Sequence, residues 1–386
     1  MQAKIPSNDS MNPLLELRRH GQSVWLDFLR RSLITSGELG HRVAEDGLAG
    51  LTSNPAIFQQ AIEGNQDYVE PIAEIARDQR LTPRQVFEKL AVRDIQDAAD
   101  VLLPVYRQTG GADGFVSLEV APDVANDTQA SVEEGRRLWQ EVSRPNLMIK
   151  VPGTPEGLPA IFTLLQEGVN VNITLLFARS VYERVAQTFI EALEIRAQRG
   201  DQVSGVASVA SFFVSRIDAA VESRMAALRG ALSEDERTRL DALAGRVAIA
   251  NAKLAYQSYK RIFSGPRWGA LRARGACPQR LLWASTGTKN PSYSDVLYVE
   301  ELIGPDTVNT MPPETLSAFR DHGRSRPSLE ENLPAAQRVL TDLENLGISL
   351  DEVTDALLLD GVKKFVEPFT KLLESVERRI SEANRQ

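Results

Sequence analysis

Eight short apolar segments recur along the chain, and stretches of helical pattern separate most of them. The segments lie at residues 24–28, 47–55, 114–120, 146–152, 170–177, 203–213, 280–286 and 307–313. Because helical crossovers join parallel strands of one sheet, this alternation predicts an α/β fold. Eight strands favour a closed (β/α)8 TIM barrel. An open doubly wound sheet is the second candidate, but no GxGxxG pattern follows the first segment and no phosphate-loop motif is present.

The stretches between the expected strands carry signals for helix starts. Thr82 precedes Pro83, as a cap residue precedes a proline in the first helical turn. Three Ser-x-x-Glu sequences match the capping box, in which the two side chains satisfy free amides at a helix start. These sequences begin at Ser131, Ser180 and Ser233. The tail over 335–384 is also expected to be helical and to pack on the barrel.

One domain is expected to hold most of the chain. At roughly 150 residues per domain, 386 residues suggest two to three domains, but a barrel with insertions can be of this size. The long stretches at about 56–113 and 214–278 are therefore interpreted as helical insertions around a single barrel over 15–386. Residues 1–14 are expected to form a flexible N-terminal arm.

Composition and charge exclude several classes of protein. Hydrophobic residues make up 42% and charged residues 25%, which is typical of globular proteins and not of disordered ones. The net charge of −8 argues against nucleic acid or a membrane as partner. The single cysteine, Cys277, cannot form an internal disulfide, and no apolar run approaches the roughly 20 residues of a membrane span. With no signal-peptide core at the N-terminus, these features favour a cytoplasmic protein.

Polar residues alternate with apolar ones in several of the expected strands. In a barrel, helices cover the outer face of the sheet and side chains fill its interior, so both faces of each strand are buried. Such parallel strands normally read as continuous apolar runs. In the segment 170–177, Asn172 and Thr174 share one face and the apolar residues share the other. Since the apolar face meets the helices, the polar face is expected to point into the barrel. The same alternation turns further polar side chains inward: Asp27, Thr52, Asn54, Ser117, Glu119 and Lys150.

Lys150 has the most specific chemistry among these inward residues. A low-dielectric interior disfavours the charged ammonium and frees an amine, which can attack a ketone or aldehyde to form a Schiff base. Asp27 and Glu119 can then move protons at the substrate hydroxyl and at the water of the imine. A purely structural ion pair between Lys150 and one of these carboxylates explains the pattern equally well at this stage.

Five further residues are candidates for binding a sugar phosphate. Asn54 and Asn172 can hydrogen-bond hydroxyl groups, although either can instead fix its own loop. Ser211 and Arg216 lie at a strand-to-helix junction, where a guanidinium beside a helix start suits a phosphate dianion. Lys289, after the seventh segment, is a second candidate for the anion site, with an ordinary solvated lysine as the alternative.

Taken together, these segments resemble those of the transaldolases, a family of Schiff-base (class I) aldolases. The matching stretches span 24–218 in the family's order and continue beyond it: VWLDF, LTSNPAIF, SLEVAP, IKVPGT, VNITLLF, SFFVSRID and LLWASTGTKN. The resemblance, closest to the long bacterial type, implies a circularly permuted aldolase barrel with the imine lysine on its fourth strand. It also implies that no metal and no organic cofactor is needed.

The resemblance further implies an activity in the non-oxidative pentose phosphate pathway. A dihydroxyacetone unit would pass from sedoheptulose 7-phosphate to glyceraldehyde 3-phosphate, giving erythrose 4-phosphate and fructose 6-phosphate. By the same resemblance Lys150 forms the imine and Asp27 moves the proton of the ketose hydroxyl. Glu119 handles the catalytic water together with Thr174.

The resemblance assigns the binding residues in the same way. Asn54 and Asn172 would hold the dihydroxyacetone hydroxyls, while Ser211 and Arg216 would bind phosphate. A second phosphate-binding arginine of many family members has no clear counterpart here, and Lys289 is expected to replace it. The expected partners are therefore sugar phosphates, with the protein a monomer or homodimer.

Three other functions remain open at this stage. A lyase that splits fructose 6-phosphate would share Lys150 and Asp27, but related lyases carry a glutamine where this chain has Glu119. A catalytically silent sugar-phosphate-binding barrel would use Lys150 only as an ion-pair partner. A sugar isomerase is compatible with the fold, because a barrel alone does not determine function.

Overall fold

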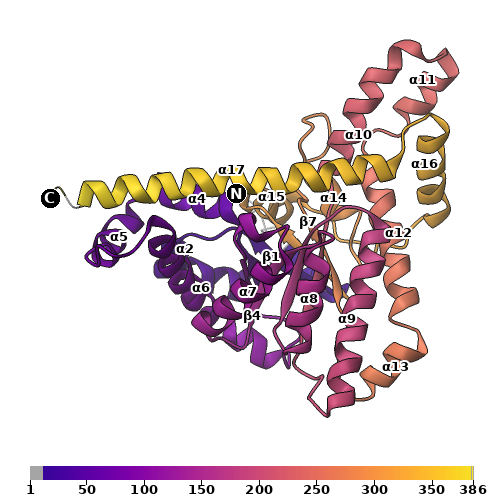
Figure 1. The fold of residues 1–386 in the computed structure, drawn as a ribbon. Helices are drawn as coiled ribbons and strands as arrows, with labels where there is room; N and C mark the ends of the chain where they lie inside the picture. Colours follow the sequence, from indigo (N-terminus) through magenta and orange to yellow (C-terminus); the bar gives the residue numbers. More distant parts are fainter. Residues whose placement is uncertain (1–11, 384, 386) are drawn as a thin grey trace, which may run out of the picture.

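The computed structural model describes residues 12–383 and 385, and these form a closed barrel of eight parallel strands (Figure 1). Each strand pairs with the next, and the last pairs with the first. The strands are β1 (Gln22–Asp27), β2 (Gly50–Thr52), β3 (Phe115–Glu119), β4 (Leu147–Pro152), β5 (Val171–Leu176), β6 (Ser208–Phe213), β7 (Arg280–Ala284) and β8 (Thr307–Met311). All eight overlap the segments expected from the sequence, so the TIM barrel is confirmed and the open sheet is wrong.

Helices surround the barrel and fill both long stretches that were interpreted as insertions. They are α1 (Pro13–Arg19), α2 (Arg31–Thr35), α3 (Glu38–Asp46), α4 (Pro55–Gly64), α5 (Val69–Ile75), α6 (Pro83–Gln108), α7 (Thr128–Val142), α8 (Gly157–Gln166), α9 (Arg179–Arg199), α10 (Ser215–Leu228), α11 (Glu234–Asp241), α12 (Val247–Ile262), α13 (Pro266–Arg272), α14 (Leu297–Glu300), α15 (Pro313–His322), α16 (Leu333–Asn345) and α17 (Leu350–Ala383). Three short 3-10 helices are η1 (Gln66–Tyr68), η2 (Pro122–Val124) and η3 (Arg229–Ala231). Of the expected arm over 1–14, residues 1–11 lie outside the described residues, and α1 begins at Pro13.

The capping signals locate some helix starts correctly and misplace others. Thr82 and Ser233 form complete capping boxes at the starts of α6 and α11, as expected. Ser131, in contrast, lies inside α7, because the Asp127 carboxylate already caps that helix by accepting from a backbone amide at 3.0 Å. Ser180 lies inside α9, which begins one residue earlier without a side-chain cap. The Ser-x-x-Glu spacing therefore gave two wrong helix starts out of three.

The end of the barrel at which the strands begin is closed by interior side chains. Trp25 is fully buried there, and its Nε1 donates to Asp113 Oδ1 over 2.7 Å. Neighbouring Gly50 must lack a side chain, because a Cβ at that position would lie 2.3 Å from the Trp25 ring. Arg280 Nη1 donates to Ser23 Oγ over 2.7 Å in the same region. These side chains separate the end at which the strands begin from the polar side chains near the carboxyl ends of the strands.

The long C-terminal helix α17 crosses the barrel at the carboxyl ends of the strands (Figure 1). It packs on α4, α5, α6 and α10 and contacts β5. Phe369 on this helix meets the edge of the Phe87 ring on α6, with the ring centroids 6.0 Å apart. The expected helical tail is thereby confirmed as α16 and α17, and α17 covers the mouth of the barrel.

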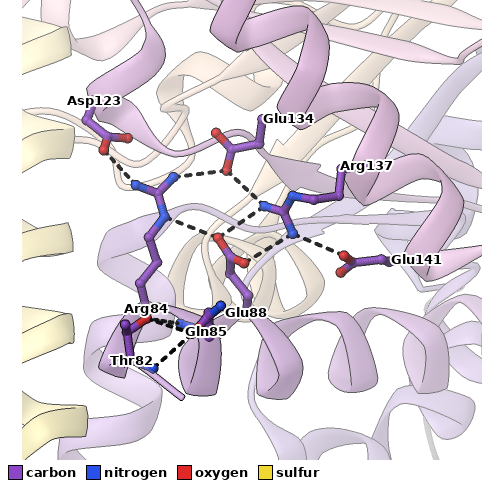
Figure 2. Close-up of polar contacts among 8 residues, drawn as sticks. All are labelled: Thr82, Arg84, Gln85, Glu88, Asp123, Glu134, Arg137 and Glu141. Carbon is purple, nitrogen blue, oxygen red and sulfur yellow. Dashed lines mark hydrogen bonds and ion pairs between the residues drawn. The ribbon is translucent and has the colours of Figure 1, made fainter. Parts of the chain in front are cut away.

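A cluster of ion pairs lies between α6 and α7 and extends to η2, close to α17 (Figure 2). Arg84 is its centre: the guanidinium lies 2.7 Å from Asp123, 3.2 Å from Glu88 and 3.4 Å from Glu134. Glu134 is 91% buried, and burial raises the pKa of its carboxyl while Arg84 offsets part of that effect. Arg84 also lies 5.7 Å from the Phe369 ring centroid. The cluster therefore links α6 and α7 to the helix over the barrel mouth.

Candidate active site

A cavity of about 160 Å³ lies at the carboxyl ends of the strands, beneath α17. Its lining includes seven of the nine residues predicted from the sequence, namely Asp27, Asn54, Lys150, Thr174, Ser211, Arg216 and Lys289. The remaining two, Glu119 and Asn172, lie in the barrel wall as the register neighbours of Lys150. Residues from β1, β4, β5 and β6 and from the loops after β2 and β7 thus converge on one site, at the end where barrel enzymes carry their active sites.

Lys150 and Glu119 form a buried pair in the wall of this cavity. Lys150 Nζ lies 3.3 Å from Glu119 Oε2, and the two side chains are only 6% and 4% exposed. The same Nζ donates to the backbone oxygen of Ser53 over 3.2 Å and lies 6.0 Å from the ring centroid of Phe365. Burial raises the pKa of the Glu119 carboxyl above its usual value, and the Lys150 charge offsets part of that effect. A carboxyl that readily holds a proton therefore stands beside the amine.

Asp27 is held in the cavity by the Thr52 hydroxyl, which in turn contacts the hydroxyl of Thr310 on another strand. Thr52 Oγ1 donates to Asp27 Oδ1 over 2.6 Å, and Thr52 Oγ1 lies 2.8 Å from Thr310 Oγ1. Thr52 was among the side chains expected to point inward, whereas Thr310 was not recognised. Alternation in the eighth segment does not point to Thr310, because the polar Thr307 and Asn309 share the other face. Its direction follows only from its register with Trp25 on β1. The two threonines fix the direction of the Asp27 carboxylate.

Asn172 lies behind the cavity and bridges neighbouring strands. Its Nδ2 donates to Ser117 Oγ over 3.0 Å, and its Oδ1 accepts from Ser211 Oγ over 2.6 Å. Both ends of the amide are thus engaged with the barrel wall. Thr174, two residues further along β5, lines the cavity, and its buried Oγ1 has no hydrogen-bond partner within the described part of the chain. That hydroxyl is free to bind a water or a substrate atom.

Asn54 occupies a different element from the one expected. The second segment was predicted as a strand over 47–55, but β2 ends at Thr52 and Asn54 is the N-cap of α4. Its Oδ1 accepts from the backbone amide of Ile57 over 3.0 Å. The residue nevertheless lines the cavity, so its side-chain amide group can still donate to a ligand there.

Two cationic residues, Arg216 and Lys289, also line the cavity. Arg216 is the second residue of α10, and its buried Nη1 has no hydrogen-bond partner among the residues that the structure describes. Burial lowers the pKa of Arg216, and the guanidinium lies 5.1 Å from the ring centroid of Phe213. Lys289 is exposed, follows β7 and lines the same cavity. A guanidinium, an ammonium and a helix start at one cavity favour binding of a phosphate group.

Phe365 of α17 also lines the cavity, whereas the sequence predicts only that its helical tail packs on the barrel. No strand or loop signal points to it, because its place depends on how α17 folds back over the barrel. Within residues 12–383, no group of three His, Cys, Asp or Glu side chains is arranged to hold a metal ion. In the same range, no helix combines the length and the apolar character needed to cross a membrane.

Comparison with known proteins identifies the family of the chain. Residues 24–376 match the model of a family described as transaldolase/fructose-6-phosphate aldolase. The chain is 47% identical to a transaldolase of Trichodesmium erythraeum over 96% of its own length and 98% of that protein. It is 46% identical to a transaldolase of Thiobacillus denitrificans, covering 95% and 100% of the two chains. A transaldolase of Neisseria gonorrhoeae is 44% identical, with 94% and 99% covered. The chain therefore belongs to the transaldolase/fructose-6-phosphate aldolase family.

Proposed function

We propose that this site performs transaldolase chemistry through a Schiff base on Lys150. The family and its relatives make the chain a transferase of aldehyde or ketone residues. The observation that supports the mechanism most strongly is the buried lysine, paired with a carboxyl of raised pKa, in a cavity that also holds two cations. A structural ion pair alone would not need a cavity with phosphate-binding groups in its wall.

In the first half of the reaction, the Lys150 amine attacks the carbonyl carbon of the ketose phosphate. The resulting carbinolamine loses its hydroxyl as water, and Glu119 supplies the proton for that step. Thr174 holds this water through its free hydroxyl. Asp27 then removes the proton from the hydroxyl next to the bond that breaks, and the aldose phosphate leaves while the dihydroxyacetone enamine stays on Lys150.

In the second half, the enamine attacks the aldehyde of the acceptor. Asp27 returns its proton to the new hydroxyl, and Glu119 with Thr174 directs water to hydrolyse the imine. Thr52 and Thr310 keep Asp27 in the same direction in both halves. Each proton-handling group therefore ends the cycle in the state in which it began.

The phosphate of each substrate is proposed to bind between Arg216, Lys289 and the start of α10. Asn54 would donate to a hydroxyl of the dihydroxyacetone unit from the amide group that its capping bond leaves free. Ser211 and Asn172 would act as a pair. They hydrogen-bond to each other, so either side chain binds a ligand only by giving up that bond for a bond to the ligand. The proposal includes sugar phosphates as substrates, a cytoplasmic location, and a monomer or homodimer formed from one barrel domain.

Product analysis with and without an acceptor tests this function against the lyase of the same family. The chain is incubated with fructose 6-phosphate alone and then with erythrose 4-phosphate added. A transaldolase turns over to sedoheptulose 7-phosphate and glyceraldehyde 3-phosphate only in the second reaction, and without acceptor it releases about one equivalent of glyceraldehyde 3-phosphate per enzyme. Free dihydroxyacetone formed equally fast without acceptor would instead identify a lyase. Bound substrate with no product in either reaction would identify a silent binding barrel.

A further inference from the structure

Thr174 borders a β-bulge in β5, at the point where this strand pairs with β6. Along the pair of β5 and β6, Ile173 is opposite Ala210 and Leu176 is opposite Phe212, so β5 contains one extra residue in this interval. Leu175 takes up the irregularity with a φ of +60°, a left-handed conformation that residues with a Cβ avoid. An extra residue in one strand re-aims the side chains beside it. Thr174 is the residue directly before this left-handed position.

Helix α17 packs directly against Leu175. Leu175 is 1% exposed, and a Cβ added at Gly361 would lie 2.9 Å from Leu175 Cδ2. The absence of a side chain at Gly361 therefore allows the helix to lie directly against the leucine. One helical turn later, Phe365 lines the cavity near Lys150. The same helix thus contacts both the bulge and the catalytic cavity.

We propose that Leu175 and Gly361 are positioning residues for Thr174. The contact with α17 keeps Leu175 left-handed, and the bulge in turn directs the Thr174 hydroxyl toward the water between Lys150 and Glu119. If Leu175 relaxed to ordinary extended backbone, the bulge would disappear and the residues after it would shift by one position to the opposite face of the strand. Thr174 would then lose the backbone turn that fixes the position of its hydroxyl. The inference rests on the proposed role of Thr174 in handling the catalytic water.

Gly361→Ala is the first test, because its methyl group would displace Leu175 without removing any side chain. Alanine is favoured over glycine inside a helix, so the folded state is expected to persist. A small misplacement of a catalytic group commonly costs about tenfold to a hundredfold in rate. We therefore expect kcat to fall by about tenfold or more, with KM for fructose 6-phosphate nearly unchanged. The matched control is Gly40→Ala in α3, where a Cβ meets nothing within 4 Å and kcat should not change.

A double-mutant cycle shows whether the effect passes through Thr174. If it does, Gly361→Ala lowers kcat in the otherwise unchanged protein but has no further effect in a Thr174→Ala background. If the two losses multiply, the helix acts on another group and the positioning inference is overturned. If Thr174→Ala alone leaves kcat unchanged, the proposed role of Thr174 is itself wrong. The two failures are therefore distinguishable.

Leu175→Met provides a second variant in case Gly361→Ala does not fold. Methionine keeps nearly the same volume but is unbranched and flexible, so the contact with Gly361 loosens while burial is retained. We expect a smaller loss of kcat in the same direction, again absent in the Thr174→Ala background. A loss of equal size in both backgrounds would contradict the inference.

Discussion

Lys150 and Glu119 are direct register partners on β4 and β3, and Nζ lies 3.3 Å from Oε2 in the wall of the cavity. The contact is an ion pair when Glu119 is ionised, and it places a proton donor next to the Lys150 nitrogen when Glu119 is protonated. These two interpretations of Lys150, which were alternatives in the sequence, describe one arrangement in the structure. A binding barrel would also need the cavity and its cations, so what separates the enzyme from a silent barrel is the second carboxylate, Asp27, and, within residues 12–383, the free Thr174 hydroxyl in the same cavity.

Glu119→Gln is expected to lower kcat by about 10²-fold to 10⁴-fold, the usual contribution of a positioned acid or base. Glutamine keeps the size and polarity of the side chain but cannot supply or accept the proton. Steady-state kinetics with fructose 6-phosphate and erythrose 4-phosphate measures the effect. The exposed Glu133→Gln on α7 serves as control and should retain full activity. An unchanged kcat in Glu119→Gln would show that another group handles the water.

Arg216→Met and Lys289→Met are each expected to raise KM for the phosphorylated ketose. A charge-assisted hydrogen bond contributes about 1.5–3 kcal/mol, which corresponds to roughly tenfold to a hundredfold in binding. Because Arg216 is more buried than Lys289, its effect should be the larger. Inhibition by inorganic phosphate should weaken in parallel, and Lys371→Met on the exposed face of α17 is the control. If Lys289→Met left KM unchanged, the residue would not belong to the anion site.

Asp218 is expected to make folding stability depend on pH. Its buried carboxylate accepts from the Ala248 amide of α12 and from the Tyr298 hydroxyl, and burial raises the pKa of Asp218 from 3.8 to about 6. Because the folded pKa is the higher one, the native state binds more protons between these values. Stability from this group is therefore present at low pH and is lost as the pH rises through about 6, by about 3 kcal/mol in all.

Urea unfolding of the unchanged protein and of Asp218→Asn at several pH values tests this dependence. The stability of the unchanged protein relative to the variant should fall between about pH 4 and pH 7. Asp241→Asn is the control, since Asp241 is exposed and Arg229 lowers the pKa of its carboxyl. For Asp241→Asn, the stability of the unchanged protein relative to the variant should instead rise with pH, and only in the acidic range. A pH-independent difference for Asp218→Asn would contradict the assignment.

Arg84→Met is expected to destabilise the protein by about 1–3 kcal/mol, because Glu134 would lose its main compensating charge while remaining buried. The flexible apolar side chain can still pack against Phe369, so the loss reports chiefly on charge. Chemical denaturation measures it. Arg93→Met, which breaks only an exposed pair with Asp97, should cost less than about 0.5 kcal/mol. Equal losses in the two variants would mean that the ion-pair cluster does not contribute more than a surface pair.

The barrel and most of its site could be predicted because the signals are local. Strand residues alternate with a period of two, so inward polar residues such as Asp27, Lys150 and Thr174 stand out within buried strands. Asn54 shows the limit of this argument, since a proline after it ends the strand early and begins a helix. Once the strands are paired, the register of β3 with β4 places Glu119 beside Lys150.

Other parts of the site could not be predicted because they depend on distant contacts. Phe365 and Gly361 belong to a helix whose apolar pattern predicts that it packs on the barrel, but not that it crosses the cavity. The bulge at Leu175 leaves no trace in the sequence, because leucine is ordinary in a strand and unfavourable in a left-handed conformation. Both features arise only when α17 lies over the barrel.

The most direct test of the account is reduction with borohydride in the presence of fructose 6-phosphate, followed by intact and peptide mass spectrometry. The Schiff-base mechanism predicts a three-carbon adduct on Lys150, and no adduct on the buried Lys253 of α12 or on Lys289. Protein that is folded and saturated with substrate, yet carries no modification at Lys150 after reduction, would contradict the Schiff-base mechanism.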